Sequence, residues 1–168
     1  MAYQASTRAL PLCTVIDLKG HRDDVVPRLQ RLGLRDPAPG RRAGHGTLEL
    51  LRVGNEQWWL LAPLPQEDRL LAAVLASPPA ADTLVLAVSD AWQFFAIDGP
   101  DARQLIAIAC PLDVDSAAFP TDGATFTEAF GQKALLMRRG DGFELAVERS
   151  YTPMLLDYFS RANPVHRG

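Results

Sequence analysis

Hydrophobic and polar residues alternate along this chain with two different periods, which together predict an order of strands and helices. Apolar runs of about four to eight residues between Gly, Pro, Asn or Asp are typical of strands, whereas apolar positions three and four residues apart are typical of helices. Strands are predicted at 13–18, 47–53, 57–61, 83–88, 92–97, 125–130, 132–137 and 143–147. Helices are predicted at 23–32, 65–76, 100–110 and 151–162.

The stretch Asp82–Asp115 is the most strongly patterned part of the chain. Thr83–Val88 is an uninterrupted aliphatic and β-branched run, which predicts a strand covered on both faces. A helix is expected to begin at Pro100, whose fixed φ suits a first turn, with Asp101 facing the positive end of the helix dipole. Pro111 ends this helix, because its ring would clash with the preceding turn.

Two segments carry no regular pattern. Met1–Pro11 is polar, and we interpret it as a loose lead-in or an arm lying on a neighbour. Arg35–Gly46 contains two prolines, three glycines and three arginines, which predicts a loop. Gly33 is expected to end the first helix in a left-handed conformation, and Ser150 is expected to cap the last helix.

The order of the predicted elements indicates an α+β fold. Strand–helix–strand–strand–helix–strand is followed by strand–helix–strand–strand–strand–helix, which describes two similar modules at about 12–89 and 90–162 within a single compact chain, 1–168. Most adjacent strands are joined by tight turns, so the modules are expected to hold antiparallel strands backed by helices. A doubly wound parallel sheet is not expected, since parallel strands need long crossovers.

Composition narrows the classes of partner. The chain has 168 residues, of which 48% are hydrophobic and 22% charged, and its formal net charge is −3. Without a basic excess to displace counterions from phosphate, nucleic acid is not the expected partner. No apolar run approaches the roughly 20 residues of a membrane span, and no N-terminal signal is recognisable, so we expect a cytoplasmic protein without a membrane partner.

Motifs that carry chemistry are weak throughout. The two cysteines and three histidines have no zinc-like spacing, and no metal site is predicted. Neither a phosphate-binding glycine loop nor a nucleophile elbow is present. The carboxylates mostly stand at helix starts and turn corners, where accepting backbone N–H groups is a sufficient role for them. No catalytic residue is therefore predicted, and a subunit or binding module is favoured over a free-standing enzyme.

Trp58 and Trp59 form the most conspicuous aromatic pair. Successive side chains of a strand point to opposite faces, so one ring is expected in the core and the other to look outward. An outward tryptophan is usually covered by a loop or by another chain, since such a ring suits an interface anchor. The pair is therefore an interface candidate.

Several strings, taken in order, resemble the gamma subunit of heterotetrameric sarcosine oxidase. Val88–Pro120 is similar to that family's Val-Ser-Asp opening, Gly-Pro-x-Ala helix start and Cys-Pro-Leu-Asp corner; Gly140–Phe159 is similar to its Gly-x-Phe-Glu-Leu and Arg-Ser-Tyr segment; and Gly54–Pro63 resembles its Trp-Leu-Leu-x-Pro segment. The signature or interface candidates are Trp58, Trp59, Asp90, Gly99, Cys110, Pro111, Leu112, Asp113, Gly142, Phe143, Ser150 and Tyr151.

The resemblance implies a fold like the folate-binding core of the aminomethyltransferase (T-protein) of glycine cleavage. T-proteins carry an aspartate on a hairpin that works on the folate-bound one-carbon unit, whereas the corresponding segment here, Gly131–Ala134, has no acid. Glu144 falls in a segment similar to another T-protein motif and is the one candidate to bond a pterin edge. A cross-strand or rim carboxylate is the alternative interpretation of Glu144.

The function implied is that of a non-catalytic structural subunit. The family's complex oxidatively demethylates sarcosine to glycine and delivers the one-carbon unit to tetrahydrofolate. Its FAD, FMN, NAD, zinc and tetrahydrofolate would lie on other subunits, with no cofactor on this chain, and the partners would be the alpha, beta and delta subunits. Two alternatives stay open: a free-standing folate-binding T-protein-like factor, and the equivalent subunit of an N-methylglutamate-type dehydrogenase.

Overall fold

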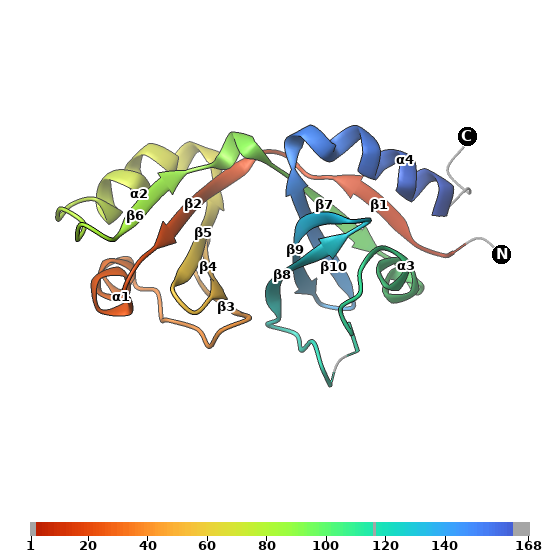
Figure 1. Ribbon diagram of the computed structural model, residues 1–168, viewed down its shortest axis with the longest axis horizontal. Coiled ribbons are helices and arrows are strands. Elements are labelled where there is room, and N and C mark those ends of the chain that lie inside the picture. Colours follow the sequence, from red (N-terminus) through yellow and green to blue (C-terminus); the bar gives the residue numbers. More distant parts are fainter. Residues whose placement is uncertain (1–2, 116, 163–168) are drawn as a thin grey trace. The chain divides into compact units, whose positions relative to one another are not determined.

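Residues 3–115 and 117–162 are described in the computed structural model of the chain. The chain divides into two compact units: the first is Leu12–Ser89, and the second joins the N-terminal segment through Pro11 to the chain from Asp90 onward. Each unit contains one five-stranded antiparallel sheet (Figure 1). Helices back one face of each sheet, so the predicted α+β class with two modules of antiparallel strands is confirmed.

The first unit orders its strands β3-β4-β5-β2-β6. These strands are β2 (Cys13–Lys19), β3 (Arg41–His45), β4 (Leu48–Gly54), β5 (Gln57–Pro63) and β6 (Leu84–Ala87). The helices are α1 (Arg22–Gln30) and α2 (Glu67–Val74), the latter preceded by a 3-10 turn, Leu64–Gln66. The predicted hairpin of β4 and β5 is confirmed, and Gly33 has the expected left-handed φ, 76°.

Alternation along the strands builds the core of the first unit. Leu18, Trp58 and Leu60 point to the helix-backed face, where they pack with Val25 and Leu29 of α1. Leu70 and Val74 of α2 complete the same cluster. The opposite face of the sheet is also apolar, because the residues one position along each strand are hydrophobic too. Its members are Val15, Leu51, Trp59 and Leu61, each at most 6% exposed.

The second unit orders its strands β1-β7-β10-β9-β8. These strands are β1 (Ser6–Ala9), β7 (Trp92–Asp98), β8 (Ala124–Ala129), β9 (Gln132–Arg139) and β10 (Gly142–Glu148). The helices are α3 (Ala102–Ala109) and α4 (Thr152–Ala162), with 3-10 turns at Ser89–Ala91 and Arg149–Tyr151. Its core joins Phe95 and Ile97 of β7 to Leu105 of α3 and to Leu155 and Phe159 of α4.

The two sheets have matching strand orders, but each takes its last strand from an unexpected place in the sequence. Read from one edge, β3-β4-β5-β2-β6 corresponds to β8-β9-β10-β7-β1. Edge strand β6 belongs to the first unit, and the next strand in sequence, β7, belongs to the second unit. Edge strand β1 belongs to the second unit, and the next strand in sequence, β2, belongs to the first unit. The chain therefore crosses between the units twice, and the second unit is not a continuous segment.

The structure corrects three of the predicted segments. Met1–Pro11 was interpreted as a loose lead-in or an arm lying on a neighbour, but its described part contains β1, which pairs with β7 of the same chain from Ser6↔Asp98 to Ala9↔Phe95. Arg35–Gly46 is not wholly a loop, because β3 pairs with β4. The run Thr83–Val88 is not a strand covered on both faces: β6 is an edge strand bonded to β2, and Leu84 and Leu86 are 44% and 45% exposed.

Arg28 ties α1 to the segment that follows α2. Its side chain is 3% exposed, and its Nη1 donates to the carbonyl oxygen of Val74 at 3.1 Å. Its Nη2 donates to the carbonyl oxygen of Pro78 and to Oδ1 of Asp24, both at 2.8 Å. The last carbonyls of a helix have no partner within the helix, so a buried guanidinium is well suited to satisfy them.

The same guanidinium sets a pH dependence. Hydrogen bonds from Arg28 lower the pKa of Asp24 from its ordinary value of 3.8 to about 2, against the opposing effect of burial. Because the folded state holds its proton less tightly than the unfolded state, Asp24 stabilises the fold fully above pH 3.8, and this contribution is lost as the pH falls through about 2.

We therefore expect Asp24→Asn to lower the free energy of unfolding near neutral pH and to make little difference at pH 2. Urea unfolding of both proteins across this pH range is the measurement. Asp23→Asn is the matched control, because the Asp23 side chain is 89% exposed and lies one residue away. Parallel stability curves for wild type and Asp24→Asn down to pH 2 would contradict the assignment.

Candidate functional site

The Cys-Pro-Leu-Asp corner follows α3 in the second unit. Cys110 is buried, and its Sγ lies 3.3 Å from Oγ1 of Thr127 on β8 and accepts the amide of Leu112 at 3.4 Å. Oδ1 of Asp113 accepts the amide of Asp115 at 2.9 Å, which is an Asx turn. Pro111 is exposed. The corner thus connects α3 to the β8–β9 hairpin through the thiol, and its carboxylate shapes a turn.

The β8–β9 hairpin turns at Phe130–Gly131, where both residues have positive φ, 50° and 79°. A phenylalanine in this region is strained, since Gly, Asn and Asp are the residues that usually occupy such a turn. The Phe130 ring stacks on Tyr158 of α4 with centroids 4.6 Å apart, and its amide donates to the carbonyl oxygen of Ala109 at 2.8 Å. Packing and a hydrogen bond therefore hold the strained residue.

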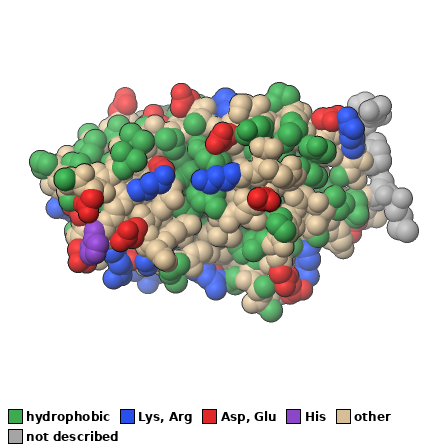
Figure 2. Space-filling model, viewed as in Figure 1, with side chains coloured by type: hydrophobic (Ala, Val, Ile, Leu, Met, Phe, Trp, Pro, Cys, Tyr) green, Lys and Arg blue, Asp and Glu red, His purple; other side chains and the backbone are tan. Residues whose placement is uncertain are grey.

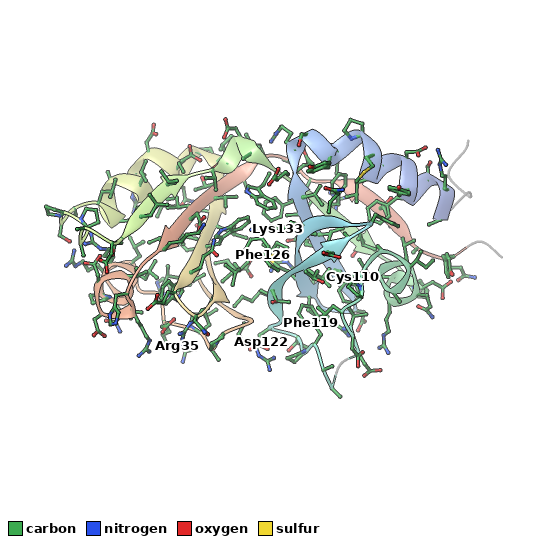
Figure 3. All side chains as sticks on the ribbon, in the orientation of Figure 1. Arg35, Cys110, Phe119, Asp122, Phe126 and Lys133 are labelled. Atoms are coloured by element: carbon green, nitrogen blue, oxygen red, sulfur yellow. The ribbon has the colours of Figure 1, made fainter. Side chains whose placement is uncertain are left out.

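A cation and two aromatic rings lie together on the face of this sheet away from the helices. Nζ of Lys133 lies 4.3 Å from the centroid of the Phe126 ring, and that ring is 5.9 Å from the ring of Trp92. Figure 3 labels Lys133 and Phe126 on the hairpin, with Cys110 and Phe119 on the segment before it. Such a platform of ring and ammonium favours contact with an anionic or aromatic group, and Glu128 lies directly opposite Lys133 in the register of β8 and β9.

The two signature glycines, Gly99 and Gly142, line one open basin of about 600 Å³ in the second unit. A Cβ at Gly99 would lie 2.5 Å from the carbonyl oxygen of Gln4, and one at Gly142 would lie 2.6 Å from that of Ile97. Both glycines are therefore required by close approach of neighbouring backbone, which is a structural role.

Three arginines also line this basin, and each is already engaged. Arg103 pairs with Asp115 at 3.1 Å. Arg138 donates to the carbonyl oxygen of Val114 at 2.8 Å, with its guanidinium 5.0 Å from the centroid of the buried Phe143 ring. Arg139 pairs with Glu144 at 2.8 Å. Asp98 and Asp141 line the same basin, so its positive charge is offset and it is not a concentrated anion site.

Glu144, the pterin candidate, projects from β10. It sits opposite Met137 of β9, and its Oε2 is bonded to the guanidinium of Arg139, two residues further along the same strand. Both side chains are partly buried, 22% and 28% exposed. This geometry is that of a cross-strand ion pair, which occupies the carboxylate with a partner from its own sheet.

Both tryptophans of the first unit are buried, at 0% and 1% exposure, so the prediction of an outward ring is wrong. The expected opposite orientation holds, because Trp58 belongs to the helix-backed core and Trp59 to the other face, which is itself apolar. Nε1 of Trp58 donates to Oδ1 of Asp36 at 2.8 Å, and Oδ2 of Asp36 accepts Nε of Arg22 at 2.7 Å.

Asp36 is the polar centre that sequence reasoning missed. Its side chain is 6% exposed, and it receives the indole N–H, Arg22 and, at 3.5 Å, Arg52, whose guanidinium also lies 5.4 Å from the Trp58 ring. The only signal was an aspartate before a proline inside a segment predicted as a loop.

The remaining signature residues are dispersed. Asp90 is exposed, and its carbonyl oxygen accepts Nε of Arg149 at 2.6 Å. Ser150 lies inside the 3-10 turn before α4 and does not cap that helix, which corrects its predicted role, because the helix begins at Thr152. Tyr151 is 36% exposed. Gly99 and Gly142 are brought together, whereas the signature as a whole does not converge on one site.

In residues 3–115 and 117–162, no three His, Cys, Asp or Glu side chains gather as metal ligands would. Over the same residues, no helix combines the length and apolar character needed to cross a membrane.

Comparison with known proteins gives a fold. Neither a protein-family model nor a curated protein sequence matches the chain. Among solved structures, a chain of the heterotetrameric sarcosine oxidase from Corynebacterium sp. U-96, in complex with pyrrole 2-carboxylate, is similar with a TM-score of 0.83 and 20% identity, over 94% of this chain and 83% of that one. The two chains therefore share a fold.

The glycine cleavage system aminomethyltransferase T from Bartonella henselae is similar over a smaller part of its length. Its TM-score is 0.68 at 18% identity, and the match covers 95% of this chain but 46% of that one. The chain therefore spans less than half of this aminomethyltransferase. The predicted likeness to the T-protein core is confirmed at the level of fold.

Proposed function

We propose that this chain is a non-catalytic structural subunit of a sarcosine-oxidase-type complex, which demethylates sarcosine oxidatively and passes the one-carbon unit to tetrahydrofolate. The observation that carries the proposal is the near-complete mutual coverage of this chain and a chain of a heterotetrameric sarcosine oxidase, 94% and 83%. The aminomethyltransferase has more than twice the matched length. The size of the fold thus favours a subunit over a complete one-carbon enzyme.

The polar groups of the second unit support a role without chemistry. The hairpin turn that would carry an acid in the T-protein is formed by Phe130 and Gly131. Glu144 is bonded to Arg139, and Asp113 and Asp115 accept backbone amides of their own loop. A carboxylate held by a neighbouring arginine is a poor partner for a pterin, and this supports a chain to which no folate step is assigned. The proposal assigns FAD, FMN, NAD, zinc and tetrahydrofolate to other subunits of the complex.

Co-expression is the test of the subunit role. The tagged full chain, produced with the alpha, beta and delta subunits of a sarcosine-oxidase-type complex from the same genome, is expected to co-purify with them in constant stoichiometry. The chain alone is expected to show no flavin absorbance and no sarcosine turnover. A chain that stays monomeric beside these subunits would overturn the proposal, and capture by N-methylglutamate dehydrogenase subunits instead would reassign the complex.

The fold similarity to the aminomethyltransferase is the reason to test the folate-binding alternative, and calorimetry is the test. Tetrahydrofolate titrated into the isolated chain is expected to give no heat of binding. Micromolar affinity, about −8 kcal/mol, would favour a folate-binding protein. Arg139→Ala is an informative variant, since it releases Glu144 from its ion pair: folate binding gained only in this variant would show that the ion pair prevents binding.

A further inference from the structure

The two sheets have four edge strands, and one of them differs from the other three. β1 carries Ser6, Thr7 and Arg8; β8 carries two threonines and a glutamate; and β3 carries two arginines and a histidine. β6 consists of Leu84, Val85, Leu86 and Ala87 only. Natural edge strands are usually protected by charge, proline or a bulge, because open backbone groups pair with other chains. Within the described residues, β6 has none of these protections.

The register fixes which backbone groups of β6 point outward. The amide of Val88 donates to the carbonyl oxygen of Val15 at 2.8 Å, and the pairing continues as Asp17↔Leu86. Bonded pairs alternate along an antiparallel ladder, so the N–H and C=O groups of Leu84 and Leu86 face β2. Those of Val85 and Ala87 consequently point away from the sheet.

The side chains of β6 also divide between core and surface. Val85 packs against the helix-backed core of the first unit. Leu84 and Leu86 project to the other face and are 44% and 45% exposed, and in Figure 2 hydrophobic side chains gather over the region where Figure 1 shows α2 and β6. Two exposed leucines beside two outward-facing peptide groups match an extended chain with apolar residues at alternate positions.

We propose that β6 receives an extended apolar segment of a larger partner subunit as an added antiparallel or parallel strand. This inference rests on the proposed function, because the occupant belongs to the complex assigned above. A second copy of this chain is disfavoured by size: β6 pairing with itself would join four residues a side, whereas stable interfaces take roughly 20–30. If a partner subunit is already bound to this chain through another surface, its segment on β6 does not need to bury the area of a complete interface.

Amide hydrogen exchange at single-residue resolution is the first measurement. In the full chain alone, the amides of Val85 and Ala87 are expected to exchange freely, while those of Leu84 and Leu86 are protected by β2. In the co-purified complex, the exchange of Val85 and Ala87 is expected to slow about 100-fold or more. A complex that forms and leaves these two amides unprotected overturns the docked strand but leaves the subunit role intact. Failure of the complex to form overturns both.

Charge placed on the edge is the second measurement. Leu84→Lys with Leu86→Lys is expected to weaken assembly about 10- to 100-fold. The matched control is Leu64→Lys with Leu75→Lys, which adds the same charge to the same unit at side chains 37% and 40% exposed. Equal losses in both double variants would contradict the assignment. Protection of Val85 and Ala87 that appears in the free chain at high concentration would also contradict it, by identifying a second copy as the occupant.

Discussion

Arg28→Met is expected to lower the free energy of unfolding by about 3–4 kcal/mol. The substitution keeps most of the apolar stem but removes every donor from a side chain that is 3% exposed. Asp24 loses its ion pair, and the carbonyl oxygens of Val74 and Pro78 lose their hydrogen bonds. A buried group left without its partner costs more than the pair itself contributes, so the loss is large. Urea unfolding at neutral pH measures it.

Arg31→Met is the matched control for this experiment. Arg31 lies one turn nearer the end of the same region, is exposed, and donates to Oγ of Ser77 at 3.1 Å. An exposed hydrogen bond of this kind is worth little, so we expect a loss below about 1 kcal/mol. Similar losses in the two variants would show that Arg28 acts through general charge and not through its buried hydrogen bonds.

Gly99→Ala is expected to destabilise the second unit by about 3 kcal/mol or more, and to release β1 from β7. Gly99 has φ 113°, which side-chain-bearing residues rarely adopt, and its new Cβ would lie 2.5 Å from the carbonyl oxygen of Gln4 and 3.0 Å from Cα of Ala5. Both contacts are backbone of the segment that leads into β1, so the clash is relieved by moving that segment. Thermal unfolding and limited proteolysis of the N-terminal residues measure the two effects.

Gly131→Ala separates strain from clash. Gly131 also has positive φ, 79°, but a Cβ there would meet nothing within 4 Å. Its expected cost is the backbone strain alone, about 1–2 kcal/mol, with β1 as resistant to protease as in the wild type. If Gly99→Ala were no worse than Gly131→Ala, the close approach of Gln4 would not be the reason for the glycine.

Elements with local signals were predictable from the sequence. The β4–β5 and β9–β10 hairpins are apolar runs joined by short polar turns, and both lie where their patterns place them. The four helices were recognisable because an apolar face at helical spacing needs no knowledge of the partner. β1 and β3 were missed for the opposite reason. Both are short, polar edge strands without an apolar pattern. The partner of β1 is also as far away in sequence as Asp98 is from Ser6, whereas β3 pairs with the adjacent β4 and was hidden by its Arg, Gly and His residues, which predict a loop.

The limits of prediction for the candidate site have similar physical causes. Thr83–Val88 was expected to be buried on both faces because the run is apolar. Apolar residues do not show, however, whether this chain or another molecule buries them, and β6 lies at the edge of its sheet. The exposure of Trp59 was misjudged because alternation fixes the face of a residue and not what lies on that face. Asp36 lacked any motif, since its partners come from three separate segments, at Arg22, Arg52 and Trp58.

The position of β1 has a consequence for synthesis on the ribosome. Asp98, the pairing partner of Ser6, is added to the chain roughly 90 residues after it, which corresponds to about 5–20 s of translation. All of Leu12–Ser89 has been made by then, so the whole first unit can fold before β1 has a partner strand to pair with. β1 is thus synthesised before β7 and can take its place in the sheet only after the whole first unit has been made.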